Sequence, residues 1–311
     1  KVDKYIQEVF WRVYWKGWLE MRPQVWTDFV EDLKTIEEDT NYIKAIDGET
    51  EIKCFNDWVK ELKEFNYLHN HTRMLFASIW IFTLGLPWQK GAEFFMKHLF
   101  DGDAASNTLS WRWVAGIQTK GKHYLAQAWN INKFTNNNYK NVMLNESAWP
   151  IIDKREYRIS SFQINKNDDL NEHLIVFDNE IHIESFNLEK YKKIYFFLLD
   201  NKDRAIKLDS KVLSFKKKII ISRLNTDELN KSELLDDNGF KSLVSKSNNF
   251  DVVYPTVGEN LSFLKKLTKK NDLRINFITR QEDEFCWKFS NKGYFNFKSN
   301  IPIILSTFKL N

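Results

Sequence analysis

The chain has 311 residues, of which 43% are hydrophobic and 28% charged, and its formal net charge at pH 7 is +4. This balance is typical of a globular protein with a sizeable core, and so small a net charge does not by itself indicate nucleic-acid binding. Two cysteines, Cys54 and Cys286, are too few for a disulfide framework, an iron–sulfur cluster or a cysteine zinc site. We therefore expect a cytoplasmic protein without a metal site.

Helical periodicity dominates the first half of the chain. Apolar residues follow helical spacing within residues 4–21, with Pro23 just beyond them, and again within residues 55–65. Residues 70–84 are apolar nearly all round, which predicts a helix buried on most sides. The apolar run 74–86 is shorter than the roughly 20 residues that cross a bilayer, so no membrane partner is expected.

A polar motif follows this apolar segment. Residues 101–113 read Asp-Gly-Asp-Ala-Ala-Ser-Asn-Thr-Leu-Ser-Trp-Arg-Trp. Asp103 is expected to cap a helix that runs from Ala104 to Trp113, because its carboxylate can accept the free amide hydrogens of the first turn. Taken alone, Asp-Gly-Asp predicts a turn and a cap and no chemistry.

The composition changes between the two halves of the chain. Eleven of the twelve tryptophans lie in residues 1–150. We predict a helical domain over residues 1–145, a linker over residues 146–170 and a second domain over residues 171–311.

Short apolar runs in the second domain are fit for strands buried on both faces. They are residues 174–177, 194–199, 252–254 and 275–278, and helical stretches at 207–221 and 257–270 lie between them. This alternation predicts an α/β domain with a mainly parallel sheet. No glycine-rich phosphate loop follows any of these strands, so the sequence does not support a nucleotide there. A pocket for an antenna pigment and a role in packing or partner binding both stay open.

The order and approximate spacing of the motifs in the first half resemble the FAD-binding domain of DNA photolyases and cryptochromes over about residues 4–140. The matching residues are Asn70, Arg73, Met74, Trp88, Asp101, Gly102, Asp103, Asn107, Trp111 and Trp113, together with residues 8–12. Photolyases carry an α/β domain before the flavin domain, whereas here it follows. That order resembles a bacterial photolyase-like subgroup with a C-terminal α/β domain, as do residues 285–287 and 293–297.

The resemblance implies an all-α domain that binds FAD. Its cofactor contacts would be Arg12, Asn70, Arg73, Asp101, Asp103 and Asn107. Arg73 is expected to pair with Asp101, because an arginine in a mostly apolar helix must be paired. Asn107 would lie beside the redox-active nitrogen of the flavin ring, where asparagine goes with repair rather than with signalling.

The resemblance also implies an electron relay and a lesion pocket. Trp111 and Trp88 match the first two relay members, whereas the third has only unaligned candidates, among them Trp26. The lesion contacts would be Glu8, Trp11, Asn70, Met74 and Trp113. A flipped pyrimidine pair needs such apolar and aromatic walls, since stacking must offset the cost of taking it out of DNA.

Three functions are compatible with these residues. Light-driven repair of pyrimidine dimers by a monomer acting on UV-damaged DNA is favoured, because the lesion contacts and Asn107 are retained. A cryptochrome-like blue-light receptor is the alternative, and His71, where many photolyases have a second arginine, counts toward it. A scaffold that has lost its flavin is the third, because Lys1 begins after the place where the family's phosphate-contacting residues normally lie.

Overall fold

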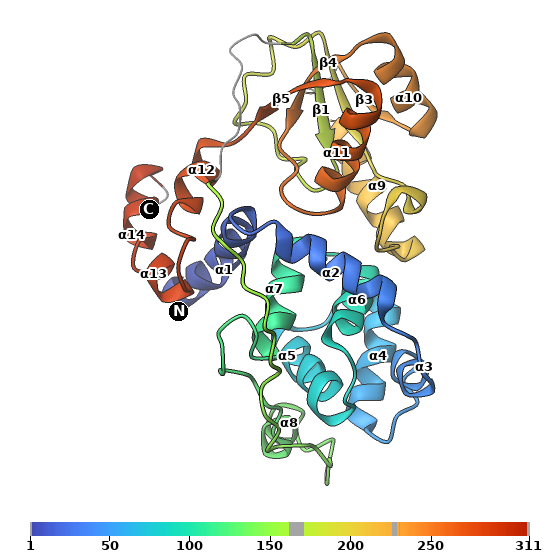
Figure 1. Cartoon of the computed structure of the whole chain (residues 1–311), viewed down its shortest axis with the longest axis vertical. Helices are drawn as coiled ribbons and strands as arrows, with labels where there is room; N and C mark the ends of the chain where they lie inside the picture. The colour runs from blue at the N-terminus through green and yellow to red at the C-terminus, as the bar shows by residue number, and fades with distance from the viewer. Residues whose placement is uncertain (1, 162–170, 226–228, 230, 310–311) are drawn as a thin grey trace. The chain divides into compact units, whose positions relative to one another are not determined.

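The computed structural model describes residues 2–161, 171–225, 229 and 231–309 (Figure 1). The chain divides into two compact units. The first, which we call the helical unit, consists of Thr27–Tyr157. The second, the sheet unit, consists of Lys1–Trp26 and Arg158–Asn311.

The helical unit is built from a succession of helices and carries most of the predicted site residues. After α2 (Gln24–Thr35), which begins at the border of the unit, come α3 (Thr40–Asp47), α4 (Lys53–Phe65), α5 (Asn70–Ser78), the π-helix η1 (Ile79–Thr83), α6 (Trp88–His98), α7 (Ala104–Val114) and α8 (Ala128–Phe134). The predicted helix over residues 70–84 is thus present as α5 and η1, and the residues from Leu75 to Phe82 are buried, as expected.

Aromatic rings fill the core of the helical unit. Phe76 of α5 lies 4.4 Å from Phe55 of α4 and 4.9 Å from Phe95 of α6, measured between ring centroids. Trp80 is fully buried and donates its indole N–H to the carbonyl of Pro87 at 2.9 Å. These rings come from α4, α5, η1 and α6, and together they fix the elements against which Trp111 of α7 packs.

The described residues of the sheet unit form a five-stranded sheet in which neighbouring strands pair in parallel. Their order is β3-β2-β1-β4-β5, with β1 (His173–Phe177), β2 (Lys193–Phe197), β3 (Ser232–Leu235), β4 (Asn249–Val253) and β5 (Arg274–Ile278). The predicted α/β class and parallel sheet are confirmed. The edge strand β3 was not predicted, because its sequence Ser-Glu-Leu-Leu is no continuous apolar run.

Helices cover both faces of this sheet, which explains why its inner strands are largely apolar. Leu174 and Val176 of β1 face a cluster that includes Ile220 of α9 (Ser210–Leu224). Ile175 and Phe177 face the opposite cluster, where α10 (Asp237–Lys246) and α11 (Glu259–Asn271) supply the cover. The helices predicted at 207–221 and 257–270 correspond to α9 and α11.

Helix α1 (Val2–Glu20) belongs to the sheet unit, whereas the sequence groups residues 1–145 together. It packs against α12 (Gln281–Trp287) and α13 (Tyr294–Lys298), which α14 (Ile301–Thr307) follows. Gly17 allows this approach, since a Cβ there would lie 2.6 Å from Ser290 Oγ and from Trp287 Cδ1. The sequence near α1 contains no pattern that indicates its packing against α12 and α13. This packing is why α1 falls in the sheet unit and not with the rest of residues 1–145.

The end of α1 is fixed to the carboxyl edge of the sheet by a buried carboxylate. Glu20 is 5% exposed and accepts hydrogen bonds from the Tyr254 hydroxyl at 2.6 Å and from the Val257 amide at 2.6 Å. Burial raises the pKa of Glu20 to about 7, against the opposing effects of these hydrogen bonds and of Lys16 and Lys265. The amide of Val257 lies directly before α11, so α1 supplies an acceptor beside the start of that helix.

Candidate functional site

The amino ends of α5 and α7 carry the polar residues of the predicted cofactor site. Asp103 caps α7, because its Oδ2 accepts a hydrogen bond from the Ser106 amide at 2.8 Å. His69 caps α5, where its Nδ1 accepts from the His71 amide at 3.2 Å. The predicted cap at Asp103 is confirmed, and both helix starts have their exposed amides directed toward polar groups.

The predicted pair of Arg73 and Asp101 is confirmed. Arg73 Nη1 lies 3.0 Å from Asp101 Oδ2, and Arg73 Nε donates to the carbonyl of Leu68 at 2.7 Å. The two side chains are 21% and 46% exposed, so the expectation of an arginine enclosed in a buried helix was wrong. Arg73 lies in the first turn of α5, before the buried part of the helix begins. An oriented but accessible ion pair of this kind remains able to contact a ligand.

Asn107 is buried in α7 and orients its amide toward α6. Its Nδ2 donates to the carbonyl of Ala92 at 2.8 Å, and the residue is 8% exposed. Because this bond directs the NH2 group toward α6, the carbonyl oxygen of the side chain points away from α6. The group that Asn107 offers to a ligand is therefore its carbonyl oxygen, an acceptor.

Trp88 and Trp111 lie on the packed helices α6 and α7, and both are buried, at 3% and 2% exposed. The ring of Trp111 lies against the backbone of α6, since a Cβ at Gly91 would be 2.3 Å from its Cη2. Gly91 is one helical turn after Trp88, so the two predicted relay members lie on facing turns. A glycine at this position is what lets the indole approach so closely.

The predicted lesion contacts are distributed over both units. Asn70 is exposed, Met74 is half-buried, and Trp113 is half-buried with its ring 6.2 Å from Tyr124, all in the helical unit. Glu8, Trp11 and Arg12 lie on α1 in the sheet unit. Their common pocket with the helical unit stays a prediction.

Trp11 has a neighbour that the sequence did not indicate. Tyr294 of α13 stacks on it with ring centroids 3.3 Å apart and an interplanar angle of 10°. Tyr294 is itself fixed by a hydrogen bond from its hydroxyl to the carbonyl of Gln7 at 2.9 Å. One face of the Trp11 indole is therefore covered within the chain, and the ring of Trp15 lies 5.2 Å away between centroids.

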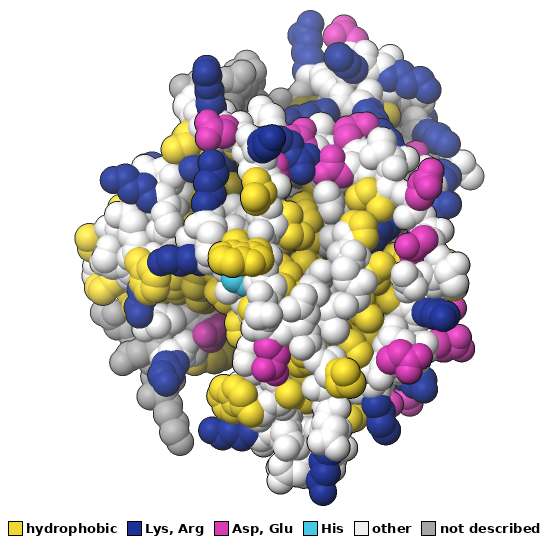
Figure 2. Space-filling model, turned by 60° about the horizontal axis from the view of Figure 1, so that its bottom comes forward, with side chains coloured by type: hydrophobic (Ala, Val, Ile, Leu, Met, Phe, Trp, Pro, Cys, Tyr) yellow, Lys and Arg dark blue, Asp and Glu magenta, His cyan; other side chains and the backbone are white. Residues whose placement is uncertain are grey.

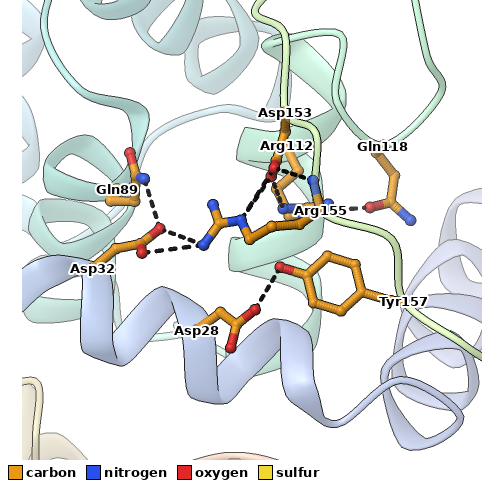
Figure 3. A network of polar contacts seen from close by, with 8 residues as sticks. All are labelled: Asp28, Asp32, Gln89, Arg112, Gln118, Asp153, Arg155 and Tyr157. Carbon is orange, nitrogen blue, oxygen red and sulfur yellow. Dashed lines mark hydrogen bonds and ion pairs between the residues drawn. The ribbon is translucent and has the colours of Figure 1, made fainter.

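A polar network at the far end of α7 was missed by the sequence analysis (Figure 3). Arg112 is 4% exposed, and its Nη1 lies 3.4 Å from Asp153 Oδ2. Arg155 donates to the same carboxylate and to Asp32 of α2, which also accepts from Gln89 at 3.0 Å. These contacts hold residues 153–157 against the helical unit, although the sequence predicts a linker over 146–170, of which 162–170 lie outside the described residues.

The pKa values of Asp153 and Tyr157 in this network are shifted in opposite directions. Although burial opposes the change, the hydrogen bonds and charge of Arg155, with the charge of Arg112, lower the pKa of Asp153. Tyr157 donates from its hydroxyl to Asp28 Oδ2 at 2.9 Å, and burial together with this bond raises the pKa of Tyr157 to about 12. The only sequence signal for the network was Arg112 itself, an arginine between two tryptophans.

Basic and acidic side chains are interspersed on the face of the molecule that Figure 2 draws, with hydrophobic side chains reaching the surface among them. Large hydrophobic side chains are exposed elsewhere in the described residues too, among them Trp129 and Trp149, which are 63% and 88% exposed. Within the described part of the chain, no helix is both long enough and apolar enough to cross a membrane. On the face that Figure 2 draws, a nucleic-acid contact would therefore depend on the local placement of basic side chains, because acidic ones lie among them.

Comparison with known proteins identifies the first half of the chain. Residues 5–143 match the family described as the FAD binding domain of DNA photolyase. Curated relatives named deoxyribodipyrimidine photo-lyase match it as well. That of Buchnera aphidicola subsp. Baizongia pistaciae is 31% identical over 126 residues, which cover 39% of this chain and 26% of that protein. That of Streptomyces griseus is 32% identical over 119 residues, which cover 38% of this chain and 26% of that protein.

The Escherichia coli protein of the same name is 26% identical over 129 residues, which cover 39% of this chain and 26% of that protein. The matched part of the chain thus spans about a quarter of the length of these relatives. No solved structure gives a significant match.

Proposed function

Because residues 5–143 belong to the family of FAD-binding domains of DNA photolyases, we propose that this chain takes part in the light-driven repair of pyrimidine dimers in DNA. FAD is the cofactor of this family, and it supplies the photochemistry when bound. The partner that we propose is UV-damaged DNA, and the proposed setting is a cytoplasmic monomer. The observation that carries the proposal is the accessible Arg73–Asp101 pair beside the capped start of α7.

The residues of the helical unit suit a flavin in charge and in hydrogen bonding. Arg73 and Asp101 offer a cation and an anion that are already oriented and still accessible. Asn107 offers an acceptor oxygen. The hydroxyls of Ser106 and Thr108 in α7 are buried without a partner within the described residues, which is the condition of polar groups that await a ligand or water.

We propose separate roles for these side chains. Arg73 and Asp101 would orient the ring system, Asn70, Arg12 and Asp103 would add polar contacts, and Asn107 would accept a hydrogen bond from the ring. Trp111 and Trp88 would pass electrons toward the cofactor. Their burial supports this role, because a dry environment protects an oxidised indole from water.

The proposed substrate contacts are Glu8, Trp11, Asn70, Met74 and Trp113. Trp11 would stack on a base, and Glu8 would accept hydrogen bonds from the base edges. Stacking of a base on an aromatic ring is worth about 1 to 3 kcal/mol, which is the size of effect needed to retain an unstacked base.

Two measurements test the proposal. The purified protein should bind FAD, which its absorption spectrum reports, and illumination should restore intact thymine in an oligonucleotide that contains cyclobutane dimers. Trp11→Ala should weaken binding to dimer-containing DNA by about 1 to 3 kcal/mol relative to intact DNA and leave flavin content unchanged. Its melting temperature must be measured alongside, because Trp11 also stacks on Tyr294.

Tyr5→Ala is the matched control, since Tyr5 is 71% exposed on the same helix and is not among the proposed contacts. Flavin binding with no dimer reversal, and equal DNA affinity in both variants, would instead favour the cryptochrome-like receptor.

A further inference from the structure

The proposed relay lacks an outer member. Trp111 and Trp88 are 2% and 3% exposed, so neither ring is in direct contact with a donor in solution. Trp26, the candidate that the sequence suggested, falls in the sheet unit. Trp80 lies 6.2 Å from Trp111 between ring centroids but is fully buried as well. A relay of these residues needs a further group that lies next to Trp88 and nearer to solvent.

Tyr157 meets this requirement. The guanidinium of Arg112 lies 5.8 Å from the Trp88 ring and 5.4 Å from the Tyr157 ring, so both rings contact the same cation. Tyr157 is half-buried, whereas Trp88 is buried. The polar network holds the segment that carries it against α2 and α7 (Figure 3). Tyr157 is thus a fixed aromatic ring that shares the guanidinium of Arg112 with Trp88 and is more exposed than Trp88.

The hydroxyl of Tyr157 is hydrogen-bonded to a proton acceptor, a carboxylate. It donates to Asp28 Oδ2 at 2.9 Å, and Asp28 is half-buried on α2 (Figure 3). Because the pKa of Tyr157 is raised to about 12, its hydroxyl keeps its proton at neutral pH. An oxidised phenol gives up that proton readily, and a carboxylate within hydrogen-bond distance is placed to accept it.

This inference rests on the proposed function. We propose that Tyr157 is the terminal electron donor of the tryptophan relay and that Asp28 is its proton acceptor. One electron passes from the Tyr157 side chain to the oxidised indole of Trp88, and the hydroxyl proton of Tyr157 passes to the Asp28 carboxylate. The products are a neutral Trp88, a neutral tyrosyl radical and a protonated Asp28. The oxidant that starts the relay is a light-excited flavin, from which Trp88 is reached through Trp111.

Arg112 gives this transfer its direction. A positive charge on the Trp88 ring is repelled by the guanidinium beside it, and that repulsion is strong because the site is buried. The tyrosyl radical that replaces it is neutral once its proton has moved to Asp28. The Arg112 guanidinium therefore destabilises the positively charged Trp88 indole, whereas it does not repel the neutral tyrosyl radical.

The test follows the radical itself and does not need flavin. Ser110 of α7 is exposed, next to Trp111, and both native cysteines are buried, so a Ser110→Cys protein can be labelled selectively with a ruthenium–bipyridine photosensitiser. Flash oxidation should produce the sharp absorption band and the paramagnetic resonance spectrum of a tyrosyl radical. When Tyr157→Phe is introduced into the labelled Ser110→Cys protein, the tyrosyl signal should be lost and an oxidised tryptophan should persist in its place.

Tyr139→Phe is the matched control. Tyr139 also donates to a carboxylate, that of Asp57 at 3.1 Å, but its ring neighbour is Trp58. It should keep the tyrosyl signal. Asp28→Asn retains an acceptor for the hydroxyl but accepts its proton poorly, so the radical should form more slowly and lose the slowing that D2O causes in the parent protein. Melting curves of all variants show whether they fold.

No tyrosyl radical in the labelled parent, or an undiminished one in Tyr157→Phe, would overturn the proposal. Because the label replaces the flavin, this result is separate from that of the repair assay. A protein that repairs no DNA but forms the Tyr157 radical would retain the relay and lose only the proposed substrate.

Discussion

Two buried carboxylates hold distant segments of this chain in place with opposite electrostatics. Asp153 of the helical unit, 9% exposed, is paired with Arg112 and Arg155. Glu20 of the sheet unit, 5% exposed, accepts from two neutral donors, the Tyr254 hydroxyl and the Val257 amide. The arginines lower the pKa of Asp153 despite its burial, whereas burial raises the pKa of Glu20 to about 7.

The difference teaches that burial alone does not decide the charge of a carboxylate. Nearby cations compensate for the lost hydration of an anion, whereas neutral hydrogen-bond donors compensate for only part of it. The two carboxylates should therefore respond differently to substitution and to pH, although both fasten a segment to a unit.

Removing the charge of Asp153 should have the larger effect. Asp153→Asn should lower the free energy of unfolding by about 3 to 4 kcal/mol, because Arg112 would remain buried without its anion. Urea denaturation at neutral pH measures this loss. The control is Glu31→Gln, which breaks an ion pair with Lys34 whose side chains are 61% and 62% exposed and should cost at most about 1 kcal/mol. Equal losses in the two variants would contradict the ion-pair assignment.

The charge of Glu20 should destabilise the folded protein, whereas the charge of Asp153 stabilises it. Its pKa is raised from 4.5 to about 7, so the folded protein binds more protons than the unfolded chain between these values. Stability should accordingly fall as the pH rises from about 4.5 to 7, by about 3 kcal/mol in all. Glu20→Gln should remove this slope and be more stable than the parent at pH 8, as melting curves across the pH range would show.

Two further comparisons sharpen the assignment. Tyr254→Phe removes a hydrogen bond that lowers the pKa of Glu20, so the fall in stability should continue to a higher pH in this variant. Asp153 should add no slope in this range, because a carboxyl whose pKa is lowered from 3.8 loses its contribution only in more acidic solution. A slope that survives in Glu20→Gln would assign the titration to another group.

The accessible pair at the cofactor site should contribute least to stability. Asp101→Asn should change the free energy of unfolding by less than about 1 kcal/mol, because Asp101 is 46% exposed. It should nevertheless lower the amount of FAD that stays bound through gel filtration. Asp47→Asn is the control, since the Asp47–Lys63 pair is similarly exposed and lies outside the proposed site. Unchanged flavin retention in Asp101→Asn would remove this pair from the cofactor site.

Most of the local features of this protein could be predicted from its sequence alone. Several helices, such as those over residues 55–65, 70–84, 207–221 and 257–270, and four of the five strands were predicted, because periodicity and apolar runs act over a few residues. The cap at Asp103 was predicted for the same reason. The ion pair of Arg73 with Asp101 was predicted from the need of an arginine in an apolar helix for a partner.

Other features were decided by tertiary structure. Nothing local indicates that α1 packs against the C-terminal helices, that Tyr294 stacks on Trp11, or that Asp153 and Arg155 secure Tyr157 beside Arg112. Each of these contacts joins residues far apart in the chain, and their free energies depend on burial and on the charge of the partner. A sequence shows which side chains are able to ionise or stack, whereas only the fold decides which of them meet away from water.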